Sequence, residues 1–298
     1  MNPAKTVERN VWVDYLRSAI TVLVVAHHAS LAYTTFASFD KSAYINSTNP
    51  VVDTNRSVLM DIFENFNDIF FMFLMFFIGG LFIARSVGNK GAAVFVKDRL
   101  YRLLLPFLIG GTLLMLLAYY PSFILAYDST EISFYIKDFF TTQQWPVGPP
   151  WFIWLLFVFN LIVALLFPFV KSSVVKTAKT IGSLQNRPFH FFMLVFVMTW
   201  LLYVPVAFSI GAGTWTGYGP FDFQLSRVLA YFGYFTLGVI TGATDFNNQL
   251  FARDAAIIKN WKGWALCALF FYATIVINSL YHVLENFVKN GHLSATAA

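Results

Sequence analysis

Seven long runs of apolar residues constrain the possible folds of this chain more than any other feature of its sequence. A helix needs about 20 mostly apolar residues to cross a bilayer. Outer-membrane strands are about 10 residues long and alternate in polarity, whereas these runs are long and apolar on all sides. The chain is therefore predicted to be an all-α, polytopic transmembrane helical bundle. The predicted spans are roughly Leu16–Tyr33, Val58–Ala84, Leu103–Tyr120, Trp151–Val170, Phe189–Phe208, Leu225–Ala243 and Trp261–Tyr281.

The composition argues against a water-soluble fold. Of the 298 residues, 58% are hydrophobic and only 12% are charged, whereas soluble domains carry about 25% charged residues. The lipid bilayer is thus the expected partner, and a cell membrane crossed several times is the expected location. The net charge of +5 comes from dispersed Lys and Arg, so no nucleic-acid partner is expected. A single cysteine, Cys267, excludes an internal disulfide and a cysteine-based metal site. No metal site is predicted.

The distribution of basic residues predicts an orientation. Fifteen of the 20 Lys and Arg lie at the N-terminus, within the start of the first span, or in the second, fourth and sixth loops. Four lie in the first and third loops and the C-terminal tail, and Arg227 lies near the outer end of the sixth span. Cytoplasmic loops carry such an excess. The asymmetry therefore supports seven spans with a cytoplasmic N-terminus.

Ionisable residues in the first span are the strongest candidates for function, because charges in lipid are costly. Arg17 and His28 are eleven residues apart, which places them on one helix face about 16 Å apart along the axis. His27 points about 100° away. An imidazole suits proton transfer near neutral pH, and a guanidinium suits an anion such as a phosphate. Alternatively, Arg17 extends to the interface and His28 only hydrogen-bonds between helices.

Several motifs together resemble the acyltransferase 3 family of membrane O-acyltransferases. They occur in the family's order over about residues 12–243, and the closest similarity is to the branch that includes glucan-modifying enzymes. Two features depart from the family: Gly79-Gly80 replaces a Ser-Gly pair, and members usually have about ten spans, so the last spans are expected to be missing here. The motifs are Arg17 and His28 separated by ten residues, Gly79-Gly80 after an aromatic-rich run, Arg99-x-x-Arg102 with Pro106, Trp151-Phe152, and the glycine- and phenylalanine-rich run Tyr231–Gly242.

The resemblance implies one membrane-embedded acyltransferase domain over residues 1–298. It implies transfer of an acyl group from a cytoplasmic acyl-CoA, which is a substrate and not a cofactor, to a hydroxyl of an extracytoplasmic sugar or glycan of the cell envelope. His28 would act as a general base or as an acyl relay, with Arg17 as its catalytic partner. Lys97, Arg99 and Arg102 would bind the donor. The alternative for these three is ordinary anchoring of a cytoplasmic loop.

Three acidic residues share one face at the start of the second span, because their spacings are three and four. Glu64 and Asp68 are candidates for acceptor binding or for orienting the histidine, while Asp61 and Glu64 also fit a solvated first turn. Trp151 could stack on a sugar, although tryptophan belts are common at membrane interfaces. The acyl group, the acceptor and the oligomeric state are not specified by the sequence.

Two other classes of function remain open. A transporter or flippase for a small polar or lipid-linked substrate would use intramembrane Arg, His and Asp to line its path. The sequence shows no internal repeat and no paired broken helices, which many transporters have. A membrane sensor or scaffold would not need an aligned Arg17 and His28.

Overall fold

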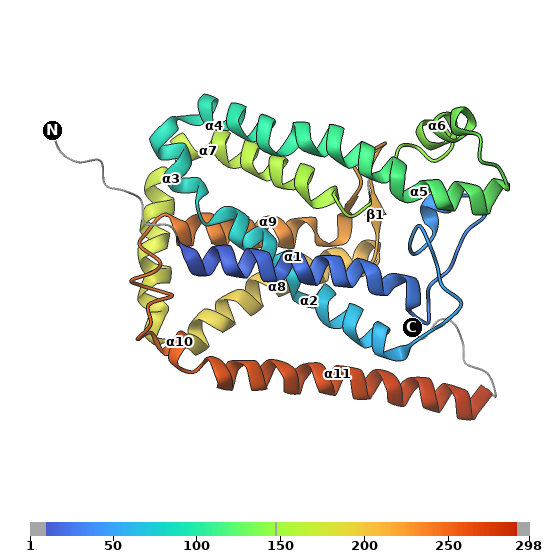
Figure 1. Cartoon of the computed structure of the whole chain (residues 1–298). Coiled ribbons are helices and arrows are strands. Elements are labelled where there is room, and N and C mark those ends of the chain that lie inside the picture. Colours follow the sequence, from blue (N-terminus) through green and yellow to red (C-terminus); the bar gives the residue numbers. More distant parts are fainter. Residues whose placement is uncertain (1–9, 147, 291–298) are drawn as a thin grey trace.

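The chain folds into a bundle of long helices (Figure 1). The computed structural model describes residues 10–146 and 148–290. All seven predicted spans are helical, which confirms the all-α class. Within the described residues, the strands are confined to a two-stranded antiparallel hairpin of β1 (Trp215–Thr216) and β2 (Phe223–Gln224). The helices are α1 (Val11–Ser30), α2 (Val58–Gly80), α3 (Ile83–Lys90), α4 (Ala92–Arg99), α5 (Thr112–Tyr127), α6 (Ile132–Phe140), α7 (Trp151–Gly182), α8 (Pro188–Ile210), α9 (Val228–Gly242), α10 (Ala256–Lys259) and α11 (Trp261–Asn290).

Five helical segments within residues 10–146 and 148–290 are long and apolar enough to cross a membrane. Helices α1 and α9 fall outside this set. Polar residues such as Arg17 and His28 lower the hydropathy of α1, and α9 has only 15 residues. The number of spans and the side of the N-terminus therefore stay predictions. The five segments are Val58–Lys90, Ala92–Tyr127, Trp151–Asn186, Pro188–Ile210 and Trp261–Tyr281.

Some helix ends differ from the predicted spans. The predicted span Val58–Ala84 is divided, because α2 ends at Gly80 and α3 begins at Ile83. Helix α7 continues past Val170 through a basic segment to Gly182, since the helix does not end where the apolar run ends. Between α4 and α5 the chain forms two π-helical turns on either side of Pro106, whose ring and missing N–H disturb regular α-helix.

The connections separate into two groups at opposite ends of the bundle (Figure 1). One end holds the α1–α2 connection, α6 and the β1–β2 hairpin, and we call it the hairpin end. The other holds the α3–α4 turn, the α7–α8 connection and α10, and we call it the basic end because the Lys- and Arg-rich loops lie there. Loops that alternate between two ends are what repeated crossings of a membrane require.

Close packing of α2 against α9 depends on glycines. A Cβ atom at Gly80 would clash with the carbonyl oxygen of Phe235, and one at Gly242 would clash with that of Leu81. Backbone atoms of the two helices therefore touch near the basic end, as small residues permit in membrane helices. Gly79 differs, because a Cβ atom there would lie 2.9 Å from a terminal carbon of Leu156, which can move.

Helices α5 and α6 form an aromatic cap at the hairpin end. The carboxylate of Asp138, buried at 3% exposure, accepts hydrogen bonds from the hydroxyls of Tyr44 (2.8 Å) and Tyr127 (3.1 Å). Tyr44 belongs to the α1–α2 connection, so these bonds fix that connection to the cap. The cap and the connection together cover the end of the bundle where the candidate site lies.

Candidate active site

A cavity of about 720 Å³ opens among the helices at the hairpin end. Helices α1, α2, α5, α7 and α9 supply lining residues, and so do the α1–α2 connection, the segment before α7 and the β1–β2 hairpin. Ligand pockets commonly enclose about 300–1,000 Å³. The polar and aromatic side chains that line it are His27, His28, Thr48, Asn49, Glu64, Asp68, Phe71, Tyr119, Trp151, Phe152, Trp215, Asp222, Gln224, Arg227 and Tyr231.

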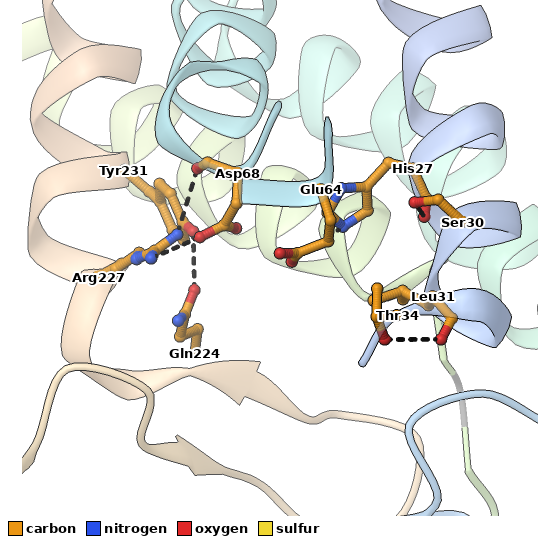
Figure 2. A network of polar contacts seen from close by, with 9 residues as sticks. All are labelled: His27, Ser30, Leu31, Thr34, Glu64, Asp68, Gln224, Arg227 and Tyr231. Carbon is orange, nitrogen blue, oxygen red and sulfur yellow. Dashed lines mark hydrogen bonds and ion pairs between the residues drawn. The ribbon is translucent and has the colours of Figure 1, made fainter. Parts of the chain in front are cut away.

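A row of polar side chains crosses the cavity from α9 to α1 (Figure 2). At one end, a guanidinium nitrogen of Arg227 lies 2.7 Å from the carboxylate of Asp68. Beside this ion pair, the hydroxyl of Tyr231 donates a hydrogen bond of 3.0 Å to the side-chain oxygen of Gln224. Glu64 lies one helical turn before Asp68 on α2 and is placed between Asp68 and His27 (Figure 2). Spacings of four residues thus place both predicted carboxylates in the cavity.

Both histidines of α1 line the cavity. His27 is 6% exposed, and its Nε2 lies 3.9 Å from a carboxylate oxygen of Glu64, close enough for an ion pair when the imidazole is protonated. His28 stands edge-on to His27, with ring centroids 5.2 Å apart. The cavity therefore extends around more than one face of α1. His28 was predicted as a site residue and His27 was not, yet both line the cavity, and the catalytic role of His28 stays a prediction.

Aromatic side chains form one wall. The rings of Trp151 and Trp215 meet edge to face with centroids 5.3 Å apart, and Tyr231 lies 5.8 Å from Trp151. The indole N–H of Trp154 donates a hydrogen bond of 2.9 Å to the backbone carbonyl of Asp222. That bond fixes the hairpin to α7, so Trp154 has a structural role while Trp151 faces the cavity.

The α1–α2 connection is held over the end of α1 by two charged side chains. The carboxylate of Asp61 accepts hydrogen bonds from the backbone N–H (2.7 Å) and the hydroxyl (2.6 Å) of Thr35. Arg56 donates to the carbonyls of Ala32 (3.2 Å) and Ala37 (3.0 Å). Asp61 therefore positions a loop that lines the cavity and is not itself a lining residue.

The predicted donor-binding residues lie away from the cavity, near the basic end. Arg17 is exposed and its guanidinium lies 5.3 Å from the ring centroid of Phe82. Lys97 and Arg102 are exposed, and Arg99 packs over the ring of Phe95 at 4.8 Å. Arg17 and Arg102 are both close enough to Arg99 for electrostatic repulsion. The structure thus gathers three guanidinium groups, but it does not join them to the cavity.

Several lining residues were not predicted from the sequence, among them Asp222, Gln224 and Arg227. Arg227 alone left a signal, as the isolated cation at the outer end of an apolar run. Burial raises the pKa of the Asp222 carboxyl above its ordinary value. No group of three or more His, Cys, Asp or Glu side chains within the described ranges is arranged to hold a metal ion.

Comparison with known protein families identifies a match. The model of a family described as "Acyltransferase domain" matches residues 10–296, nearly the whole chain. The match extends well beyond residues 12–243, over which the motifs were found. No curated protein and no solved structure matches the chain.

Proposed function

This chain belongs to the acyltransferase 3 family, and from that premise we propose that it transfers an acyl group from acyl-CoA to a hydroxyl of an extracytoplasmic carbohydrate. Family membership makes it a membrane acyltransferase in general. The identity of the donor, the identity of the acceptor and the orientation of the chain in the membrane are what we propose. A transporter or flippase receives no comparable support.

One observation carries the proposal: the two imidazoles of α1 face a cavity that is also lined by carboxylates and by a group of aromatic rings. Imidazole is the common general base for a hydroxyl group. Carboxylates accept hydrogen bonds from hydroxyls, and aromatic faces suit the apolar faces of a sugar. A hydroxyl-bearing acceptor would therefore find a base, hydrogen-bond partners and a stacking surface in the same place.

The proposed reaction centres on His28. One imidazole nitrogen of His28 takes the proton of the acceptor hydroxyl, and the oxygen of that hydroxyl attacks the thioester carbonyl. The C–S bond then breaks, the new ester bond remains, and the proton passes to the leaving CoA thiolate. If His28 is instead the nucleophile, its nitrogen attacks the thioester carbonyl, the C–S bond breaks, and the CoA thiolate leaves with the imidazole proton. The acceptor oxygen then attacks the acyl-imidazole, the C–N bond breaks, and the acceptor proton returns to the imidazole. Glu64 orients His27, whose ring packs against His28.

The donor is proposed to bind from the basic end. Phosphate groups suit guanidinium groups, and Arg17, Arg99 and Arg102 gather there. The distance along α1 from Arg17 to His28 is about 16 Å. A donor held at Arg17 must therefore place its thioester far from its phosphates, and the long pantetheine arm of acyl-CoA has that form.

Replacing the histidines one at a time tests the proposal. His28→Ala should lower acyl transfer by about 10²–10⁴-fold, the usual contribution of a general base. His27→Ala should have a smaller effect, because it removes a positioning contact. The measurement is transfer of radiolabelled acyl groups from acyl-CoA to envelope glycans in membranes, with protein amounts matched by immunoblot.

Mass spectrometry of envelope glycans from cells with and without the gene identifies the product. One acyl-sized mass difference that disappears in the His28→Ala strain is expected. Equal transfer by wild-type protein and His28→Ala would contradict the assignment of His28. If no glycan changes mass, the acceptor class is wrong.

A further inference from the structure

The charged groups that line the cavity are unequal in sign. Three carboxylates face it, from Glu64, Asp68 and Asp222, and one guanidinium faces it, from Arg227. The two imidazoles are ordinarily neutral near pH 7. The cavity therefore carries an excess of negative charge even when every cation in its lining is counted.

Pairing within the cavity neutralises only one carboxylate. Arg227 contacts Asp68 at 2.7 Å, and their side chains are 16% and 35% exposed, so the pair is partly shielded from water. Glu64 has His27 at 3.9 Å, a distance too long for a hydrogen bond. Among the described residues, the carboxylate of Asp222 makes no ion pair with a Lys, Arg or His. Two carboxylates thus face the cavity without a permanent cation.

The surroundings of these carboxylates disfavour negative charge. Burial raises the pKa of Asp222, as it does for carboxyls removed from water without a cation nearby. Electrostatic interactions grow as the local dielectric constant falls. A second anion placed in this cavity would therefore be repelled more strongly than in water.

The neutral groups of the lining fit a polyhydroxyl molecule. The imidazole of His27, which is 6% exposed, lines the cavity. The side chains of Thr48 and Asn49 also line the cavity. The hydroxyl of Thr48 and the side-chain amide of Asn49 can exchange hydrogen bonds with sugar hydroxyl groups, which both donate and accept. Trp151 and Trp215 add apolar ring surface beside them.

We infer that this cavity selects a polyhydroxyl acceptor without negative charge and excludes sugars that carry carboxylate or phosphate groups. The inference rests on the proposed function and specifies its acceptor. Amino groups on the sugar are compatible with it, because carboxylates and indole rings both attract cations.

Three glycosides of matched shape test the inference with the purified full-length chain in lipid vesicles. They are methyl β-glucoside, methyl β-glucuronide and the methyl ester of that glucuronide, offered with radiolabelled acetyl-CoA. The free glucuronide should have a kcat/KM at least tenfold below both neutral glycosides, which corresponds to about 1.4 kcal/mol. Calorimetry on the same three glycosides without a donor should give affinities in the same order, with the free glucuronide binding most weakly.

Variants connect the discrimination to the named carboxylates. Asp222→Asn and Glu64→Gln should each reduce the ratio between the neutral ester and the free glucuronide. Asp128→Asn removes an exposed carboxylate that does not line the cavity, and it should leave the ratio as it is in the wild type.

The experiment distinguishes failure of the charge inference from failure of the proposed function. If the ester and the free acid bind equally well and react equally well, the charge inference is overturned and the proposed function stands. If none of the three accepts an acyl group, the proposed function is contradicted for these acceptors and this donor, and the binding order alone decides the inference.

Discussion

Helices α2 and α9 meet differently at the two ends of their contact. Near the basic end, Gly80 and Gly242 bring backbone against backbone, and there is no room for a single methyl group. Near the hairpin end, α2 presents Glu64 and Asp68 to a cavity of about 720 Å³, while α9 presents Tyr231 and the turn just before α9 presents Arg227. We call the part of this contact around Gly80 and Gly242 the closed half, and the part around Glu64, Asp68 and Arg227 the hollow half.

The contrast indicates that one half of this helix contact stabilises the fold and the other half forms the candidate site. Close helix contact is the main source of stability between membrane helices, because lipid provides no hydrophobic drive to associate them. The closed half can therefore hold the hollow half open and fix its polar side chains. If this is correct, substitutions in the closed half should affect folding first, and substitutions in the hollow half should affect activity first.

The largest effect is expected in the closed half. Gly80→Ala and Gly242→Ala each place a methyl group against a backbone oxygen, so the helices must separate. Overpacking of this kind costs about 1–3 kcal/mol or more. We expect little folded protein, measured by fluorescence-detected size exclusion in detergent, together with loss of acyl transfer.

Two glycines serve as controls for these substitutions. Gly263→Ala on α11 meets nothing within 4 Å, and Gly79→Ala meets only the flexible side chain of Leu156. Alanine is preferred over glycine in a helix by about 1 kcal/mol, so Gly263→Ala should be neutral or slightly stabilising. If the Gly80→Ala variant were as stable as the Gly79→Ala variant, the closed half would not be tightly packed.

These glycines also show what the sequence could predict. The apolar runs define the helices, and the spacing of Arg17 and His28 identifies α1, because both signals are local. The difference between Gly79 and Gly80 is not local, since it depends on which atoms of α7 and α9 lie opposite. The resemblance expects Ser-Gly at this pair, and the structure explains why the first position has more freedom than the second.

The cavity was only partly predictable for the same reason. Glu64 and Asp68 are recognisable because helical spacing places them on one face of α2. Asp222 and Gln224 lie in a short hairpin whose place over the cavity depends on a hydrogen bond from Trp154, 68 residues earlier in the chain. Likewise, the ion pair between Asp68 and Arg227 joins residues 159 positions apart. No local pattern encodes such contacts.

An intermediate effect is expected from the ion pair in the hollow half. Arg227→Met leaves the partly exposed carboxylate of Asp68 without its cation, which should lower stability by about 1–3 kcal/mol. The double variant Asp68→Leu with Arg227→Met removes both charges and should recover much of that stability. Thermal unfolding in detergent measures this recovery.

Acyl transfer separates the two roles of this ion pair. If the pair helps to shape the acceptor site, the double variant should be stable but poorly active, with a raised KM for the acceptor. Full activity in the double variant would mean that the pair only stabilises the fold. The hollow half would then depend on packing in the same way as the closed half.

The smallest effect is expected at the exposed cations of the basic end. Arg17→Gln and Arg102→Gln should each raise the KM for acyl-CoA by about two- to fivefold, because exposed ion pairs contribute only about 0.2–1 kcal/mol. The increase should shrink at high salt, where such charges are screened. Lys137→Gln removes an exposed cation at the opposite end of the bundle and should leave this KM unchanged. An unchanged KM in all three variants would assign Arg17 and Arg102 to membrane anchoring, and the donor would then have to reach His28 by a route that avoids the basic end.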